Sequence, residues 1–339
     1  MTPIRPARDE DAASVAALVN EITADWFAWA PITADDLLDR WRSPRVDRQD
    51  FVVAEGSILG YASVTAADPG RTRLWAELRA ISGEDESRVS ASLLAAIEAR
   101  ARELAARADP GARVVLRTQV AEVQAQLGRL LAEAGYAVVR HAENAVRSLE
   151  PPPPPPSWPP GITPRRFRTG EERTIWELAM DALASSWDFV REPFPSWLAS
   201  QVESPAFDPE LWFVAERDGD IAGVLYCRNH PSDPEVAWLD VLAVRPEWRR
   251  RRLGTALTQE ALREFHRRGK RRAGVGIDPD NPTGVARLLA KLDFEIVQRF
   301  STFEKELRPG RPAARLLGRS ARNAGQAWRR LVSGATRAH

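Results

Sequence analysis

Cysteine is nearly absent from this chain, and the other residues that cross-link proteins or bind metals are scarce. The 339 residues include one cysteine, Cys227, two methionines and four histidines. A single cysteine excludes an intrachain disulfide and fits a reducing compartment. The histidines lie at no metal-ligand spacing from one another or from the cysteine, so we expect no metal site. They are His141, His230, His266 and His339.

Long apolar segments are also missing. No run approaches the roughly 20 residues that are needed to span a bilayer, and the N-terminal stretch MTPIRPARDEDAA has no signal-peptide pattern. We therefore expect a cytoplasmic protein without a membrane span. With 44% hydrophobic and 28% charged residues, the composition is that of a globular protein and not of a disordered one.

What the sequence does contain is a duplication on either side of a proline run. Residues 151–156 are all proline, which is typical of a stiff polyproline II spacer, with an SH3-like ligand as the alternative. IRPARDED at 4–11 and RRFRTGEE at 165–172 each lead into a helical apolar pattern. Each half then has two β-rich runs joined by a glycine turn, at 51–64 and 212–227, which predicts a hairpin.

Both halves therefore predict the same order of elements, β-α-α-β-β-β-α-β-α-β-β. This order indicates an α/β fold (α+β, with a mixed sheet) whose helices cover both faces. We expect a first domain at 1–150, a proline-rich linker at 151–160, a second domain at 161–307 and a basic tail at 308–339. The tail contains arginines and no Asp or Glu.

The stretch that indicates chemistry lies in the second half, at 237–269. An apolar, β-prone run ends at Pro246, four arginines follow at 249–252, and a helical pattern begins near Gly254. Unpaired N–H groups at a helix N-terminus and arginine side chains both bind phosphate. We interpret this strand, basic loop and helix as an anion site. The alternatives are a solvated basic patch or a nucleic-acid contact surface.

This stretch resembles the GNAT acetyltransferases. Their pyrophosphate signature, Arg/Gln-x-x-Gly-x-Gly/Ala, matches Arg249 to Gly254, with Arg252 where the family has its first glycine. The resemblance implies an acetyl-CoA cosubstrate. It also implies cofactor contacts from Leu242, Ala243, Val244, Arg249, Arg250, Arg251, Arg252, Leu253, Gly254, Thr255, Asn281 and Arg287, with the N–H groups of Leu242 and Val244 on the thioester and pantetheine.

A second part of the resemblance lies at 275–294, VGIDPDNPTGVARLLAKLDF. Asn281 before Pro282 predicts a helix start, because asparagine caps helices and proline favours the first helical position. In the family this helix contacts the pantetheine arm. Its usual tyrosine, which protonates the departing thiolate, is replaced here by Leu289.

The tandem halves, WLDVLAV and DPDNPTG together resemble the mycothiol-synthase-like branch of the GNAT proteins, over the chain to about residue 307. The glutamate that this branch has on the fourth strand falls at Trp238. Our candidate for the general base is therefore Asp240, with Glu235 as the weaker alternative. An Asp that caps neighbouring backbone is the competing reading of Asp240.

The first half lacks the basic loop. At the corresponding place it has Glu84, Asp85 and Glu86, which would repel a pyrophosphate. We interpret this half as a degenerate domain that supports the other or shapes its acceptor site.

Aromatic residues are concentrated in the second half at 182–213. If they line the acceptor pocket, as the first two helices of GNAT enzymes do, then Trp187, Phe189, Phe194 and Trp197 are candidates together with Trp238. The competing interpretation is that they belong to the core. The basic tail has apolar residues at helical spacing and is interpreted as a partly ordered terminus; a membrane-surface or nucleic-acid-binding helix is the alternative.

We conclude that the sequence predicts an N-acetyltransferase whose second domain transfers an acetyl group from acetyl-CoA to a primary amine, with a small molecule as the partner. The alternative is a catalytically silent GNAT-fold protein that binds CoA esters or acts as a scaffold. Nucleic-acid binding is the third, less supported hypothesis.

Overall fold

The computed structural model describes residues 2–24, 26, 31–43, 47–54, 58–68, 70–230, 233–281 and 283–311. The helix proposed for the basic tail, and Pro282, lie outside these residues. Within the described part of the chain, no helix is long and apolar enough to cross a membrane.

The two halves have the same order of elements, as the duplication predicted, except that each ends in one long strand instead of two. The first half contains β1 Ile4–Pro6, α1 Ala12–Thr23, α2 Ala34–Trp41, β2 Phe51–Ala54, β3 Gly60–Ala66, β4 Arg73–Ala80, α3 Glu86–Ala106, β5 Val114–Ala121, α4 Ala125–Glu133 and β6 Ala137–Ser148. The second contains β7 Thr163–Arg166, α5 Glu172–Leu183, α6 Phe194–Gln201, β8 Trp212–Arg217, β9 Asp220–Asn229, β10 Val236–Val244, α7 Leu253–Arg267, β11 Arg272–Ile277, α8 Val285–Ala290 and β12 Glu295–Arg308.

Both predicted hairpins are present. Strand β2 pairs with β3, and β8 pairs with β9, in antiparallel register. At the β8–β9 turn, Asp218 and Gly219 both have positive φ, 51° and 89°. Two successive residues of this kind match the right-handed twist of the flanking strands, which is why Asp-Gly favours a tight hairpin.

The chain forms two compact units. Of the described residues, unit 1 comprises those within 2–141 and 299–311, and unit 2 comprises those within 142–298. In unit 1 the strand order is β1-β2-β3-β4-β5-β12, with α3 and α4 packed on one face and α1 and α2 on the other.

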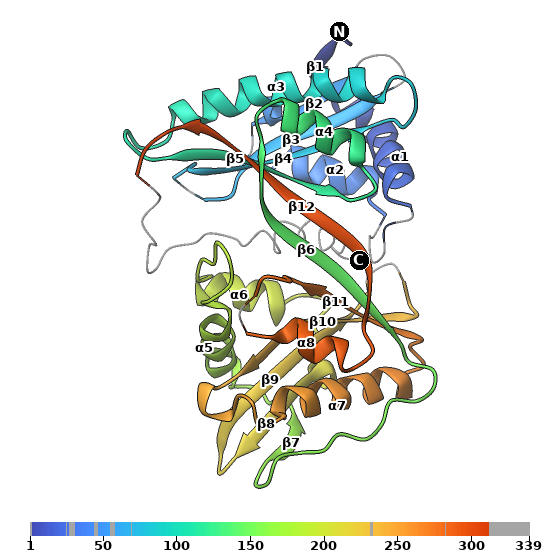
Figure 1. Ribbon diagram of the computed structural model, residues 1–339, viewed down its shortest axis with the longest axis vertical. Helices are drawn as coiled ribbons and strands as arrows, with labels where there is room; N and C mark the ends of the chain where they lie inside the picture. Colours follow the sequence, from blue (N-terminus) through green and yellow to red (C-terminus); the bar gives the residue numbers. More distant parts are fainter. Residues whose placement is uncertain are drawn as a thin grey trace. The chain divides into compact units, whose positions relative to one another are not determined.

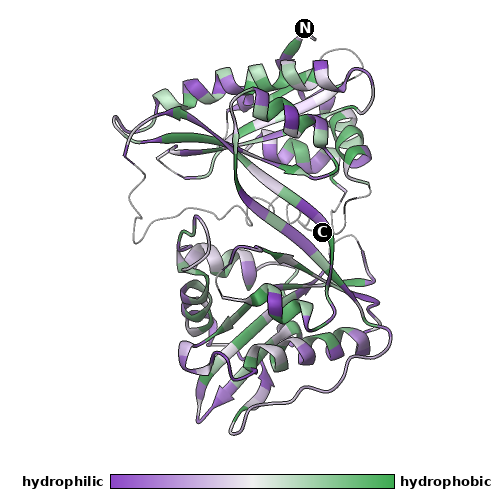
Figure 2. Ribbon diagram, in the orientation of Figure 1, coloured by the Kyte–Doolittle hydropathy of each residue, from purple (hydrophilic) through white to green (hydrophobic). Residues whose placement is uncertain are grey.

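Unit 2 has the strand order β6-β11-β10-β9-β8-β7. Helices α7 and α8 cover one face, and α5 and α6 cover the other (Figure 1). Strands β8 to β10 are largely hydrophobic, whereas β6 and β12 show both hydrophilic and hydrophobic stretches (Figure 2). Strands that are buried on both faces need apolar residues at successive positions.

The closing strands are exchanged between the halves. Strand β6 comes from the first half but pairs with β11 of unit 2, from Arg272↔Ser148 to Ile277↔Glu143. Strand β12 comes from the second half but pairs with β5 of unit 1. The compact units therefore do not follow the expected borders of 1–150 and 161–307, because long-range strand pairing is not visible in the local pattern of either half.

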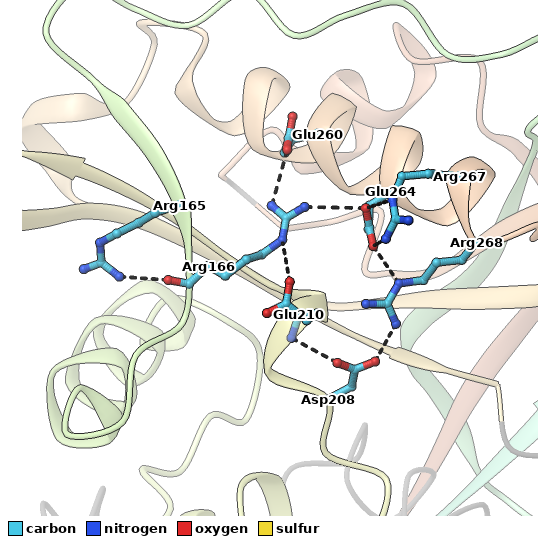
Figure 3. A network of polar contacts seen from close by, with 8 residues as sticks. All are labelled: Arg165, Arg166, Asp208, Glu210, Glu260, Glu264, Arg267 and Arg268. Atoms are coloured by element: carbon cyan, nitrogen blue, oxygen red, sulfur yellow. Dashed lines mark hydrogen bonds and ion pairs between the residues drawn. The ribbon is translucent and has the colours of Figure 1, made fainter.

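A network of ion pairs holds helix α7 to β7 and to the segment before β8 (Figure 3). Arg166 of β7 reaches Glu260 at 3.3 Å and Glu264 at 3.7 Å. Arg268 bridges Glu264, at 2.7 Å, and Asp208, at 2.5 Å. These contacts fix the C-terminal end of the helix whose N-terminus faces the candidate site.

Candidate active site

Strand β10 contains a β-bulge at Asp240. Leu239 pairs with Cys227 and Val241 with Tyr226 of β9, so Asp240 is the additional residue. The bulge reverses the faces of the strand: Leu239 packs in the core under α7, but Val241 packs in the core under α5 and α6. Bulges of this kind bend a strand and end regular pairing.

Beyond the bulge, β10 leaves β11. Their parallel pairing runs only from Val236↔Arg272 to Leu239↔Val275, although β10 continues to Val244. The N–H of Arg245 donates to Ala222 of the β9 side, so alternation directs the backbone groups of Leu242 and Val244 away from β9. These two residues therefore present their backbone N–H groups on the edge that faces away from β9, whereas the backbone of Ala243 faces β9.

The loop after β10 has an unusual backbone. Arg250 has φ 59° and Arg252 has φ 66°, both in the left-handed region that favours glycine. Arg252 is the residue before α7, and its carbonyl accepts the first helical hydrogen bond, from Ala256. The N–H groups of Leu253, Gly254 and Thr255 precede that bond, which leaves them available at the N-terminus of a 15-residue helix.

Glycine at position 254 allows close packing of this helix end. A Cβ there would lie 3.3 Å from Leu242 Cδ2 and 3.3 Å from Leu288 Cδ1. Contacts this short require the neighbours to move, so the glycine brings the start of α7 next to β10 and α8.

The four arginines of the loop are without carboxylate partners among the described residues. Arg249 donates from Nε to the Val244 carbonyl at 3.1 Å. The Arg251 guanidinium lies 5.1 Å from the centroid of the Trp248 ring. Positive charge without partners beside a helix N-terminus attracts a polyanion.

The downstream helix begins later than predicted. Asn281 does not start it: its Oδ1 accepts from the Thr283 N–H at 3.0 Å, forming a local turn, and α8 begins at Val285. Gly284, with φ 76°, separates the turn from the helix because a left-handed residue interrupts helical geometry. Arg287 is exposed on this helix, and Leu289 is buried in the core with no side-chain proton to give.

Asp240 is held by an arginine. Arg228 Nε donates to both carboxylate oxygens at 3.1 Å, and the Asp240 side chain is 5% exposed. Burial, with the Asp240 charge nearby, holds the pKa of the Cys227 thiol well above its usual range, so this cysteine is neutral. Glu235 precedes β10 at the end remote from the bulge, is 51% exposed and pairs with Arg271 at 3.7 Å, so the structure does not bring it into the site.

The predicted acceptor residues divide into two groups. Trp197 belongs to the core, at 1% exposure, where it contacts Trp212, and Phe194 stacks on it. Trp187 and Phe189 are half-buried in the connection between α5 and α6. In the same connection, Ser186 Oγ accepts a hydrogen bond from Asn281 Nδ2 at 3.5 Å. Trp197 is therefore corrected to a core residue: helix α6 turns it toward the sheet.

Two residues of this region were not singled out from the sequence. Arg228 on β9 directly opposes Trp238, and Asn144 on β6 opposes Gly276 of β11. Arg228 could have been found from the sequence, because it is a charged residue directly after the apolar run GVLYC. Asn144 could not be found, because its strand comes from the other half of the chain.

Unit 1 shares the separation of the two central parallel strands, because β4 pairs with β5 only as far as Ala76, but it lacks the bulge and the basic loop. Strand β4 pairs with β3 in continuous register with no bulge. Glu84 and Asp85, at the place of the arginine loop, are exposed, and Asp85 pairs with Arg88 of α3 at 2.7 Å. No group of three potential metal ligands occurs among the residues that the structure describes in either unit.

Comparison with known proteins agrees with this geometry. Residues 174–294 match the family model described as Acetyltransferase (GNAT) family. A mycothiol acetyltransferase of Streptomyces bingchenggensis (strain BCW-1) is 34% identical over 154 residues, which cover 44% of this chain and 46% of that protein. The chain spans about half the length of the first curated relatives that it matches.

Solved structures extend the likeness to both units. A GCN5-related N-acetyltransferase from Sphaerobacter thermophilus superposes with a TM-score of 0.73 and 26% identity, over 91% of this chain and 97% of that one. A tandem GNAT protein from the clavulanic acid biosynthesis pathway gives 0.65 at 17% identity, over 92% and 100%, and supports the fold alone. Residues 174–294 are therefore similar to the GNAT acetyltransferase family, in a chain whose fold is that of tandem GNAT proteins.

Proposed function

We propose that unit 2 transfers an acetyl group from acetyl-CoA to a primary amine of a small molecule. The observation that carries this proposal is the separation of β10 from β11 after Leu239, beside an arginine loop that has no carboxylate partners in the part of the chain that the structure describes. The open edge of β10 is followed in the chain by the N-terminus of α7, within the same unit, and both present backbone N–H donors.

The chain's own groups fit the two ends of acetyl-CoA. The pyrophosphate would be bound by the loop arginines and by the first N–H groups of α7. The open edge of β10, at Leu242 and Val244, would hold the pantetheine amides and polarise the thioester carbonyl. Acetyl-CoA supplies the activated acyl group.

The reaction is a direct displacement. The amine nitrogen attacks the thioester carbonyl carbon, a C–N bond forms, and the C–S bond breaks. The amine loses one proton and the departing thiolate takes up one. Asp240 is the candidate base, in contact with Arg228, whereas Leu289 leaves the thiolate to be protonated by water.

The acceptor side is the face covered by α5 and α6, where Trp187, Phe189 and Trp238 lie. The curated relatives are named mycothiol acetyltransferases, which suggests a mycothiol-related amine as one acceptor to test. Trp238, where that branch has a glutamate, favours a different acceptor.

A catalytically silent protein that binds CoA esters is the second candidate. The two Asp240 oxygens are both engaged by Arg228, and the position of the usual acid is a buried leucine. A protein that binds acetyl-CoA but acetylates no amine would have this second function.

The first test is calorimetric titration with acetyl-CoA. We expect one site per chain, lost in Arg249→Ala/Arg251→Ala. The matched control, Arg168→Ala/Arg271→Ala, removes the same charge from exposed positions of unit 2 and retains the site. Equal loss in both variants, or no binding at millimolar concentration, would refute the cofactor site.

The second test concerns the base. Asp240→Asn is expected to lower the rate of CoA release with an active amine and to change its pH profile. An unchanged rate and profile would remove Asp240 from the mechanism.

A further inference from the structure

The Arg228 side chain is fixed at the acceptor face of the site. It opposes Trp238 across the β9–β10 ladder, and its guanidinium carbon lies 6.0 Å from the centroid of the Trp238 ring. Its Nε is engaged by both oxygens of Asp240 at 3.1 Å. A guanidinium held by a carboxylate along one edge and by a ring on one side has little rotational freedom.

The other edge of this guanidinium is available. Neither Nη of Arg228 has a hydrogen-bond partner among the described residues, and neither is among the buried polar atoms that lack one. The side chain is 21% exposed. The two Nη groups therefore face solvent, and a pair of parallel N–H donors is the geometry that a carboxylate binds bidentately.

A hydrogen-bond acceptor lies at the other end of Trp238. Asn144 is 4% exposed, and its Nδ2 donates to Gln298 Oε1 at 3.1 Å, but its Oδ1 has no partner in the described chain. A Cβ on Gly276 would lie 3.9 Å from both Asn144 Oδ1 and Trp238 Cζ2. Asn144 Oδ1 and the edge of the Trp238 ring therefore both lie at ordinary van der Waals distance from the position that a Cβ of residue 276 would occupy.

Unit 1 has a carboxylate paired with arginines at the equivalent position. Glu77 of β4, at the position equivalent to Asp240 by strand register, pairs with Arg79 at 3.1 Å and Arg40 at 3.4 Å. The Arg79 side chain is only 6% exposed. Arg40, the second partner of Glu77, is 32% exposed and Arg228 is 21% exposed, so both units pair this carboxylate with an arginine that reaches the surface.

We infer that the acceptor is an amine that also bears a carboxylate, as an amino acid does, and that Arg228 binds this carboxylate through its two Nη groups. The inference rests on the proposed acetyl transfer. Asp240 then positions Arg228, Trp238 covers the acceptor, and Asn144 Oδ1 accepts from a polar group of the acceptor. Arg228 is a specificity residue.

The test compares the standard amino acids, each beside its carboxamide, as acceptors for acetyl-CoA-dependent thiol release. With the wild-type chain, kcat/KM for the carboxylate is expected to exceed that for the amide by about 10- to 100-fold, the usual contribution of a charge-assisted pair. Arg228→Gln removes this preference. Arg228→Lys, a point charge without the fork, retains part of it.

Because Arg228→Gln leaves Asp240 buried without its partner, the Arg228→Gln/Asp240→Asn variant is measured as well. Calorimetry with acetyl-CoA accompanies every variant and is expected to be unchanged, since neither Arg228 nor Asp240 is among the groups assigned to bind acetyl-CoA. Equal use of acids and amides by the wild type, a preference that survives Arg228→Gln, or no acetylation of any amino acid by a chain that binds acetyl-CoA would overturn the inference. Failure to bind acetyl-CoA would instead refute the proposed function on which it depends.

Discussion

Replacing Arg252 by glycine is expected to stabilise the protein and to tighten acetyl-CoA binding. Arg252 has φ 66° and ψ 8°. A left-handed conformation costs an L-residue about 1–2 kcal/mol. Glycine removes this cost but loses about 0.4–1 kcal/mol through the larger freedom of the unfolded chain. The net gain in the free energy of unfolding is therefore about 0.5–1 kcal/mol.

The neighbouring arginines provide matched controls. Arg250 also has a positive φ, 59°, so Arg250→Gly should stabilise by a similar amount. Arg251 is not among the positive-φ residues, so Arg251→Gly should destabilise by about 0.5–1 kcal/mol. All three variants lose the same charge, which isolates the backbone effect from the electrostatic one.

The assay is urea unfolding followed by tryptophan fluorescence, with calorimetric titration of acetyl-CoA on the same samples. Arg252→Gly should raise the midpoint and lower the Kd, because without Cβ the phosphate approaches the backbone N–H groups more closely. If all three variants lost stability equally, the strain argument would be wrong. If Arg252→Gly stabilised but weakened binding, the arginine charge and not close approach would dominate recognition.

Two further predictions concern the fold. Hydrogen bonds from Arg267 and then Arg268 lower the pKa of Glu264 from 4.5 to about 2, so the contribution of Glu264 to stability is present above pH 4.5 and is lost as the pH falls toward 2. The difference in the free energy of unfolding between wild type and Glu264→Gln should be on the order of 1 kcal/mol at pH 7 after solvent screening. This difference should shrink in urea titrations at pH 3, and a difference that stays constant would contradict the prediction. Because β6 completes unit 2, the fragment 161–311 should show no cooperative melt by circular dichroism unless 1–160 is present, and a sharp transition of 161–311 alone would show that the exchanged strand is dispensable.

Much of the candidate site could be read from the sequence because its signals are local. The strand that ends at Pro246, the arginine run and the helix after Gly254 are adjacent in the chain, and periodicity with turn chemistry determines such elements. The duplication and both hairpins followed from the same kind of signal. The left-handed backbone at Arg252, in contrast, was not predicted and was found only in the structure.

The start of α8 shows the limit of a local signal. Asn-Pro is a good helix beginning, yet the left-handed Gly284 moved the helix to Val285. Trp197 likewise lies in an aromatic stretch that is typical of a pocket, but tertiary packing places it on the side of α6 that faces the sheet, in the core.

The sequence by itself determined the two repeats, the strand–loop–helix that indicates a phosphate site, and the absence of that loop from the first half. Only the tertiary structure decided that β6 and β12 change places, that β10 leaves β11 after Leu239 and has a bulge at Asp240, and that Arg228, Trp238 and Asn144 share one face. The physical reason is that hydrogen bonds between distant strands and the two-residue alternation of their side chains depend on register, which is set by the whole sheet and not by any one segment.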